Sequence, residues 1–209
     1  MLYMAGALLS SAGSCMKNIH SKTATSFFLI SSSPFGPVSL LWSVYKGQPK
    51  IFRALLATPK VSAKHQVTKL FPDSQNATCS EIDAIADDIE TFFEGEDIQF
   101  SLKIVRMDLC SEFQQKVLRA EHGIPRGAVS TYQRIARHVG RPKGARAVGN
   151  ALAMNPFPII IPCHRAIRTD LSIGGYQGGI KMKRTLLQME GIDFNETGHV
   201  KTKSFVTEM

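Results

Sequence analysis

The order of apolar and polar residues in the first part of the chain is typical of short strands. Three runs rich in β-branched and aromatic residues, TSFFLI (25–30), PVSLLWSVY (37–45) and IFRALLA (51–57), are separated by the turn-forming segments SSSPFG and GQPK. We expect these runs to form consecutive antiparallel strands. A further apolar run, IQFSLKIV (98–105), predicts one more strand.

Between these strands the apolar residues recur at the spacing of a helix. KVSAKHQVTKLF (60–71) predicts a helix that ends before Pro72, and SEIDAIADDIETFFEG (80–95) predicts a second that begins at Ser80 and ends at Gly95. Residues 23–107 are therefore expected to form an α/β unit, a small antiparallel sheet with helices, and this unit contains no catalytic signature.

The pattern becomes mainly helical after Cys110. SEFQQKVLRAEHG (111–123), STYQRIARHVG (130–140) and KGARAVGNALAM (143–154) each have helical spacing. Ser130 with Gln133 predicts a capping box at the start of the second of these helices. The tight turn Gly140-Arg141-Pro142 joins the second and third, and this arrangement predicts a helix-turn-helix within a domain spanning 108–193, followed by a tail, 194–209.

The third of these helices is rich in small residues, which allow its backbone to approach another surface closely. That surface is either DNA or a neighbouring helix, and the two alternatives are compatible on different faces of the helix.

Positive charge is concentrated in the same region. The chain has 25 Lys and Arg against 17 Asp and Glu, a net charge of +8. Eight of the basic residues lie between positions 126 and 168, where there is no Asp or Glu, so the rest of the chain is neutral, with 17 basic and 17 acidic residues. A local basic surface on an otherwise neutral protein indicates a polyanionic partner, and nucleic acid is the first candidate. The simpler alternative is that these basic residues form a solvated helix face without a partner.

The ends of the chain and the cysteines exclude several protein classes. No run approaches the ~18–20 apolar residues of a membrane-spanning helix, so we expect no membrane partner. Residues 1–22 are expected to be a tail or an over-extended start, with Met16 a candidate first residue; the alternative is a signal peptide, although no basic residue precedes its apolar part. Four cysteines without a CxxC pair predict neither a disulfide scaffold nor a structural metal site.

The segment NPFPIIIPCHRAIR (155–168) contains the candidate chemistry. Three isoleucines predict a buried, strand-like run that Pro162 ends, and Cys163 and His164 follow directly. A thiol becomes a good nucleophile as a thiolate, which needs a base or a positive field nearby. Glu190 in LLQMEG is a candidate carboxylate to orient the histidine. Considered alone, a buried cysteine is more often inert packing than a nucleophile.

The motifs together resemble one family. IPCHRAI, with NPFPII before it and GGYQGG and KRTLLQMEG after it, is similar to the active-site signature of the 6-O-alkylguanine-DNA alkyltransferases, also called methylated-DNA–protein-cysteine methyltransferases. The resemblance extends through FQQKVLRA, IPRGAVSTYQRIA and ARAVGNA, in the family's order and spacing, over residues 108–193. The N-terminal unit matches only in its general α/β outline, and no ligand set for the zinc that some members bind there is present.

The resemblance implies roles for the residues of the reaction. Cys163 corresponds to the nucleophile that takes the alkyl group and keeps it as a thioether. His164 corresponds to the base, acting through a water, and Glu190 to the carboxylate that orients it. Tyr132 corresponds to the tyrosine that hydrogen-bonds the base, helps protonate the leaving guanine and pushes on the phosphate of the flipped nucleotide.

The resemblance also implies roles in binding. Arg146 corresponds to the arginine that enters the base stack, on the small-residue helix where Ala145 and Gly149 are expected to lie against DNA. Asn155 corresponds to the asparagine that braces the active-site segment. Tyr176 and Gln177 correspond to the loop that closes over the base, where Gln177 stands at a position that is often serine in the family. Lys183 corresponds to a lysine near the site.

The implied function is direct-reversal DNA repair. The protein would take the alkyl group from 6-O-alkylguanine in double-stranded DNA, with 4-O-alkylthymine as a second candidate substrate, in one irreversible turnover without a cofactor or metal. We expect a monomer located with DNA, in the cytoplasm of a prokaryote or the nucleus of a eukaryote. Three alternatives remain: a catalytically silent relative that binds alkylated DNA, which the presence of Cys163 disfavours; a DNA-binding regulator with a cysteine sensor; and a thiol hydrolase that turns over repeatedly.

Overall fold

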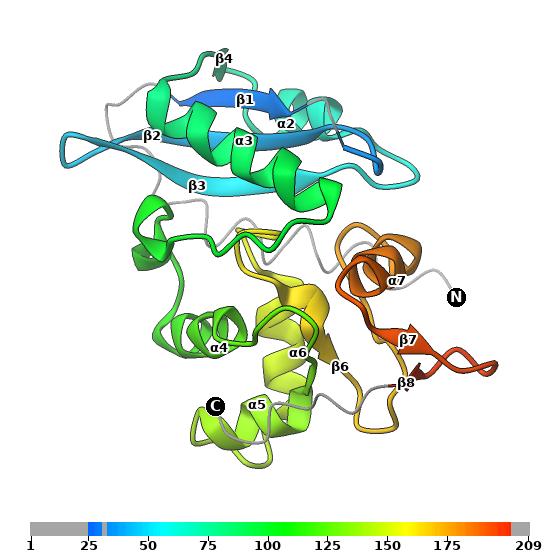
Figure 1. Ribbon diagram of the computed structural model, residues 1–209. Coiled ribbons are helices and arrows are strands. Elements are labelled where there is room, and N and C mark those ends of the chain that lie inside the picture. The colour runs from blue at the N-terminus through cyan, green and yellow to red at the C-terminus, as the bar shows by residue number, and fades with distance from the viewer. Residues whose placement is uncertain (1–24, 31–32, 202–209) are drawn as a thin grey trace.

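The N-terminal part of the computed structural model is a four-stranded sheet (Figure 1), and the structure describes residues 25–30 and 33–201. The strand order is β3 (Gln48–Leu56), β2 (Val38–Tyr45), β1 (Ser26–Ile30) and β4 (Gln75–Asn76). The antiparallel pairing of β1 with β2 and of β2 with β3 confirms the prediction for residues 25–57. The sheet is not purely antiparallel, however, because the short β4 pairs with β1 in parallel.

Two helices cover opposite faces of this sheet, because alternate residues of a strand point to opposite sides. α2 (Ala63–Leu70) buries Val67 against one face, where Leu41 belongs to the same cluster. α3 (Ser80–Glu94) buries Ile89 against the other face together with Leu40. The predicted start of α3 at Ser80 and its predicted end at Gly95 are confirmed. Gly95 adopts the left-handed conformation, which glycine accepts without a Cβ clash.

The predicted strand over residues 98–105 is wrong. This segment forms the 3-10 turn η1 (Leu102–Ile104), with a single bridge between Val105 and Ile51 of β3, and η2 (Met107–Leu109) follows it. The Ser101 side chain accepts a hydrogen bond from the Lys103 amide and starts the turn. A local side-chain bond of this kind competes with strand pairing, and apolar periodicity does not reveal it.

Three helices form the lower part of the molecule (Figure 1): α4 (Glu112–His122), α5 (Tyr132–His138) and α6 (Ala145–Ala153). α5 and α6 pack against each other across a short turn, and α4 packs against both. The predicted capping box at Ser130 is wrong. Thr131 is the N-cap residue instead, and its hydroxyl accepts a hydrogen bond of 3.1 Å from the Arg134 amide.

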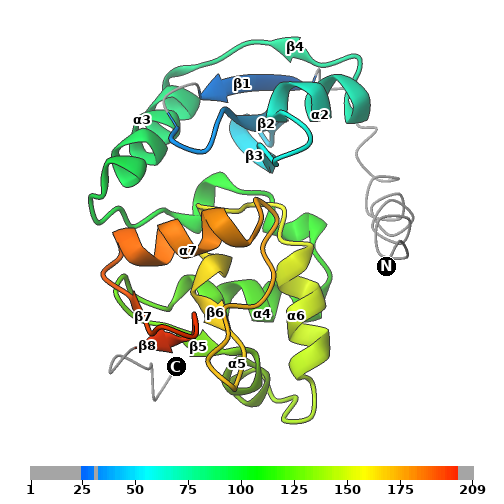
Figure 2. The same cartoon turned by 90° about the vertical axis from the view of Figure 1, so that its right-hand side faces the viewer.

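The last elements lie beside these helices (Figure 2). η3 (Cys163–Arg165) leads into β6 (Ala166–Ile167), which pairs in parallel with β5 (Ser130–Thr131). α7 (Ile180–Met189) packs against η3, and β7 (Asp193–Phe194) forms a hairpin with β8 (Val200–Lys201). Residues 194–201 of the predicted C-terminal tail therefore have structure, whereas the predicted N-terminal tail, residues 1–22, lies outside the described residues.

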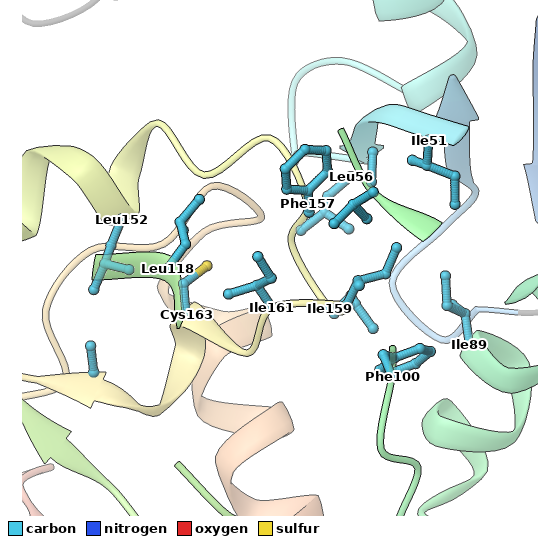
Figure 3. Packing of buried hydrophobic residues seen from close by; sticks show 14 of the residues in the cluster. Ile51, Leu56, Ile89, Phe100, Leu118, Leu152, Phe157, Ile159, Ile161 and Cys163 are labelled. Atoms are coloured by element: carbon cyan, nitrogen blue, oxygen red, sulfur yellow. The ribbon is translucent and has the colours of Figure 1, made fainter. Parts of the chain in front are cut away.

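One hydrophobic core joins the upper and lower parts (Figure 3). It includes Ile51 and Leu56 of β3 at one end and Leu118 of α4 and Cys163 at the other, with the segment 157–163 running between them. The isoleucine run 159–161 is buried as predicted, but it is a compact turn and not a strand. No helix among the described residues is both long and apolar enough to cross a membrane.

Candidate active site

The segment that ends at Cys163 is held in a strained conformation. Ile159 has φ 73°, which a β-branched residue rarely adopts. Asn155 compensates: its buried amide donates to the Ile161 carbonyl at 3.1 Å, and its side-chain oxygen accepts from the Phe157 amide at 2.9 Å. The β3 strand adds a bond from the Ala54 amide to the Pro156 carbonyl at 2.7 Å. The N-terminal sheet and Asn155 together therefore fix the backbone that presents the thiol.

Cys163 lies in the wall of an open pocket between α6 and the loop that precedes α7. The cavity volume is about 830 Å3, within the range of small-molecule sites. Its lining includes residues from four parts of the chain: Tyr132, Ala145, Arg146, Gly149, Asn150, Leu152, Ala153, Cys163, Arg168, Thr169, Gly175, Tyr176 and Gln177. Seven residues named from the sequence thus surround one cavity, while His164, Glu190, Asn155 and Lys183 do not line it.

His164 and Glu190 form a buried pair. The His164 Nε2 and Glu190 Oε1 atoms are 2.9 Å apart, and both side chains are almost fully excluded from solvent. Burial by itself raises the pKa of Glu190, but His164 and Arg165 outweigh it and lower that pKa to about 2. The carboxylate is therefore ionised and can only accept, so His164 Nε2 carries the proton of the bond.

The other nitrogen of the His164 ring is available as a base. Burial lowers the pKa of His164, against the opposing effect of Glu190, so the ring is neutral near pH 7. Its Nδ1 atom is buried and has no hydrogen-bond partner among the described residues. With Nε2 protonated, Nδ1 holds the lone pair that can accept a proton.

Arg165 completes this buried group, which sequence reasoning missed. Its Nε donates to Glu190 Oε2 at 2.9 Å and its Nη2 to Oε1 at 2.8 Å, and Nη1 donates to the Ile124 carbonyl at 2.5 Å. In the sequence this arginine is one of the eight basic residues between positions 126 and 168, which predict a basic surface, whereas in the structure it is buried. The fork geometry of a guanidinium matches a carboxylate, so Arg165 holds Glu190 in place.

The thiol of Cys163 is protonated at rest. Burial raises its pKa to about 12, a hydrogen bond from the Asn155 side chain lowers it, and the charges of Glu121 and Lys183 act in opposite directions. Cys163 is 5% exposed and packs in the core with Leu118 and Leu152 (Figure 3). Reaction of this thiol therefore needs a base to remove its proton.

Tyr132 stands at the start of α5, next to the cysteine segment, because β5 immediately before it pairs with β6 immediately after η3. Burial raises the pKa of Tyr132 to about 12, so its hydroxyl is a proton donor at neutral pH. Gly174, with φ 72°, allows the ring to approach: a Cβ atom there would lie 2.8 Å from the Tyr132 hydroxyl oxygen.

The remaining predicted residues form the loop side of the pocket. Gln177 donates from Nε2 to the Asn155 carbonyl at 2.7 Å, which gives its side chain a bracing contact. The Tyr176 hydroxyl is buried without a partner among the described residues, and its ring lies edge-on to His164, with centroids 6.2 Å apart. Lys183 is fully buried and donates from Nζ to the Ala166 carbonyl at 2.5 Å and the Gly175 carbonyl at 3.3 Å.

The basic segment divides into internal and exposed parts. Arg126 binds the Gly95, Glu96 and Met189 carbonyls, and Arg165 binds Glu190, so both serve the fold. The exposed members lie on and around α5 and α6 and next to the pocket: Arg137, Arg141, Lys143, Arg146 and Arg168. Within residues 25–30 and 33–201, no three His, Cys, Asp or Glu residues gather as a metal site would require.

These features define a buried-thiol site that opens onto a basic helical surface, and comparisons with known proteins agree. Residues 112–192 match the family model described as the DNA-binding domain of 6-O-methylguanine DNA methyltransferase. The methylated-DNA–protein-cysteine methyltransferase of Methanothermobacter thermautotrophicus is 43% identical over 111 residues, 53% of this chain and 62% of that protein. The corresponding protein of Mycobacterium leprae is 45% identical over 49% of this chain and 61% of its own length.

Solved structures extend the similarity to the N-terminal sheet. The O6-methylguanine methyltransferase of Mycobacterium tuberculosis matches with a TM-score of 0.63 and 30% identity, over 79% of this chain and 92% of that chain. The same organism's OGT in complex with DNA matches with a TM-score of 0.62 and 32% identity over the same shares. The chain therefore belongs to the O6-methylguanine-DNA methyltransferase family, although it spans less than two thirds of the length of the curated relatives that it matches in sequence.

Proposed function

We propose that this protein repairs alkylated DNA by transferring the alkyl group from O6 of guanine to its own Cys163, once and irreversibly. The observation that carries this proposal is the pocket of about 830 Å3, in which a cysteine, a tyrosine and the small-residue helix α6 face the same space. Relatives named methylated-DNA–protein-cysteine methyltransferases and a relative solved with DNA support it.

The chemistry follows from the buried groups. His164 Nδ1 takes the thiol proton, through a water, and Glu190 stabilises the resulting imidazolium. The Cys163 sulfur then attacks the alkyl carbon, a carbon–sulfur bond forms, the bond from that carbon to O6 breaks, and its electron pair stays on guanine. Tyr132 donates a proton to the guanine as it leaves. A thioether has no easy reversal, so each molecule acts once.

The exposed surface supports a mode of DNA binding. We infer that α5 and α6 act as a helix-turn-helix, with α6 against the duplex at Ala145 and Gly149, where a Cβ on Gly149 would meet no atom within 4 Å. The target base must leave the stack to reach Cys163, at a cost of a few kcal/mol. The exposed Arg146 side chain, at the edge of the pocket, would fill the gap that the base leaves.

The surrounding residues would hold the flipped base. The Tyr176–Gln177 loop closes over it, Asn155 braces the cysteine segment and Lys183 fixes the loop through the Gly175 carbonyl. We further propose that residues 108–193 form the DNA-binding and alkyl-transfer domain with 23–107 as a supporting domain. The protein would act as a monomer on double-stranded DNA, in the cytoplasm of a prokaryote or a eukaryotic nucleus.

The test is transfer of labelled methyl from 6-O-methylguanine duplex DNA. We expect one label per protein on Cys163, no transfer by Cys163→Ala with DNA binding retained, and full transfer by the control Cys79→Ala, which changes a half-buried free cysteine. Label released over many turnovers would support a thiol hydrolase instead, and DNA binding without any transfer by the native protein would support a silent binding protein.

A further inference from the structure

A second carboxylate, Glu121, is buried behind the site and has no role in the reaction described above. It lies in the last turn of α4 and is 0% exposed. Neither of its oxygens has a hydrogen-bond partner of normal geometry among the described residues, although the Ala166 amide is close enough to favour the ionised form slightly. Glu190, by contrast, accepts three hydrogen bonds. An unpaired buried carboxylate is costly unless it is neutral.

Glu121 belongs to a cluster of titratable groups from several elements. The groups that interact electrostatically with Glu121 are Lys183 from α7, Arg165 and Cys163 from η3, and Tyr132 from α5. α6 also packs against α4, but Arg146 is its only charged residue and is exposed. Of these cations, Arg165 is neutralised by its bidentate pairing with Glu190, so Lys183 is the charge that Glu121 can balance.

Lys183 and Glu121 are not joined by a direct bond. Lys183 Nζ donates to two backbone carbonyls, those of Ala166 and Gly175, and these neutral acceptors leave its charge uncompensated. Burial raises the pKa of Glu121 to about 8 and lowers that of Lys183 to about 8. The protonation of both groups therefore changes in the same pH range.

We propose that Glu121 is a positioning residue of alkyl transfer, which controls through its own protonation whether the Glu121–Lys183 pair favours or opposes the Cys163 thiolate. This inference rests on the proposed function, because it concerns the same thiol. In its neutral state Glu121 leaves the Lys183 ammonium as a net positive charge near Cys163, which stabilises a developing thiolate.

The sign of the pH effect follows from these two groups. Below about pH 8 the pair is neutral Glu121 with cationic Lys183, a charge of +1. Above it, the pair is anionic Glu121 with neutral Lys183, a charge of −1. The first state favours the thiolate and the second opposes it. Transfer should therefore stop rising and then fall in alkaline solution, where an ordinary thiol continues to gain reactivity.

The experiment compares Glu121→Gln, which keeps the shape and removes the ionisation, with the native protein across a pH series. Single-turnover methyl transfer and the ultraviolet absorbance of the thiolate are both measured, in a background without the other cysteines. We expect similar rates near neutral pH. In alkaline solution the variant should be ~10-fold faster and have ~10-fold more thiolate, the effect of one unit in the thiol pKa. The control Glu112→Gln, at an exposed site on the same helix, should follow the native profile.

Identical profiles for Glu121→Gln and the native protein would overturn the proposal. If the variant does not fold, infrared spectroscopy of the native protein decides, since a protonated carboxyl band should be present at pH 7 and disappear as the pH rises through about 8. The absence of that band overturns the proposal equally. Native protein that transfers no methyl at all would instead refute the proposed function, while the infrared and thiolate measurements would still decide the role of Glu121.

Discussion

Replacing Glu190 with glutamine should destabilise the fold strongly, because this carboxylate neutralises a buried cation. It accepts hydrogen bonds from His164 Nε2 at 2.9 Å, Arg165 Nε at 2.9 Å and Arg165 Nη2 at 2.8 Å. Glutamine has the same shape but no charge, and its amide group presents hydrogens to donors. The Arg165 guanidinium would then be buried without a counter-charge.

The magnitude follows from the pKa of Glu190, which is about 2 in the folded protein against 4.5 for a free side chain. The difference corresponds to about 3 kcal/mol at pH 7. Glu190 is only 5% exposed, so solvent screening reduces this little. Breaking a buried ion pair by removing one partner costs about 3–5 kcal/mol, which agrees. For a chain of this size the melting temperature should fall by roughly 6–12 °C.

The assay is urea unfolding of Glu190→Gln and native protein over a pH series, with Glu196→Gln, an exposed carboxylate, as control. Because the folded pKa is depressed, the stabilisation is fully present above about pH 4.5 and is lost as the pH falls toward 2. The difference between native protein and Glu190→Gln should shrink over that range. A loss below about 1 kcal/mol at pH 7, or a difference that does not change with pH, would refute the reasoning.

Three further substitutions test the proposed roles of other residues. Arg146→Ala should slow transfer from duplex DNA by roughly ten- to hundredfold at saturating protein and leave transfer from the free modified base unchanged. The exposed control Arg141→Ala should regain the native duplex rate at saturating protein. The same recovery by Arg146→Ala would make Arg146 a phosphate contact. Gly174→Ala should displace Tyr132 and slow transfer. The control Gly191→Ala, at a similar positive φ where an added Cβ would meet no atom within 4 Å, should only lower stability. Equal transfer rates for the two variants would contradict this. Asn155→Ala should lower the free energy of unfolding by about 2–4 kcal/mol, since the Phe157 amide and the Ile161 carbonyl lose their partners, and a loss below about 1 kcal/mol would argue against the bracing role.

Much of the secondary structure could be predicted from the sequence, because it depends on neighbours a few residues apart. The strands within residues 25–57 and the helices α2 to α6 follow from hydrophobic spacing and from turn-forming residues between the runs. The same local logic failed where a short-range hydrogen bond competed with periodicity. Ser101 started a turn in place of a strand, and Thr131 capped α5 in place of Ser130.

The candidate nucleophile and its neighbours could be proposed from the sequence, because the motif from Asn155 to Arg168 resembles the active-site signature of the family. What only the tertiary structure decided is the charge state of the site. Arg165, one of the eight basic residues between positions 126 and 168, proved to be the buried partner of Glu190. Glu121, one residue in a helical pattern, proved to lie near the thiol without a hydrogen-bond partner for its oxygens among the described residues. Burial and distant charges set the protonation of a side chain, and both arise only when α4, η3 and α7 pack together.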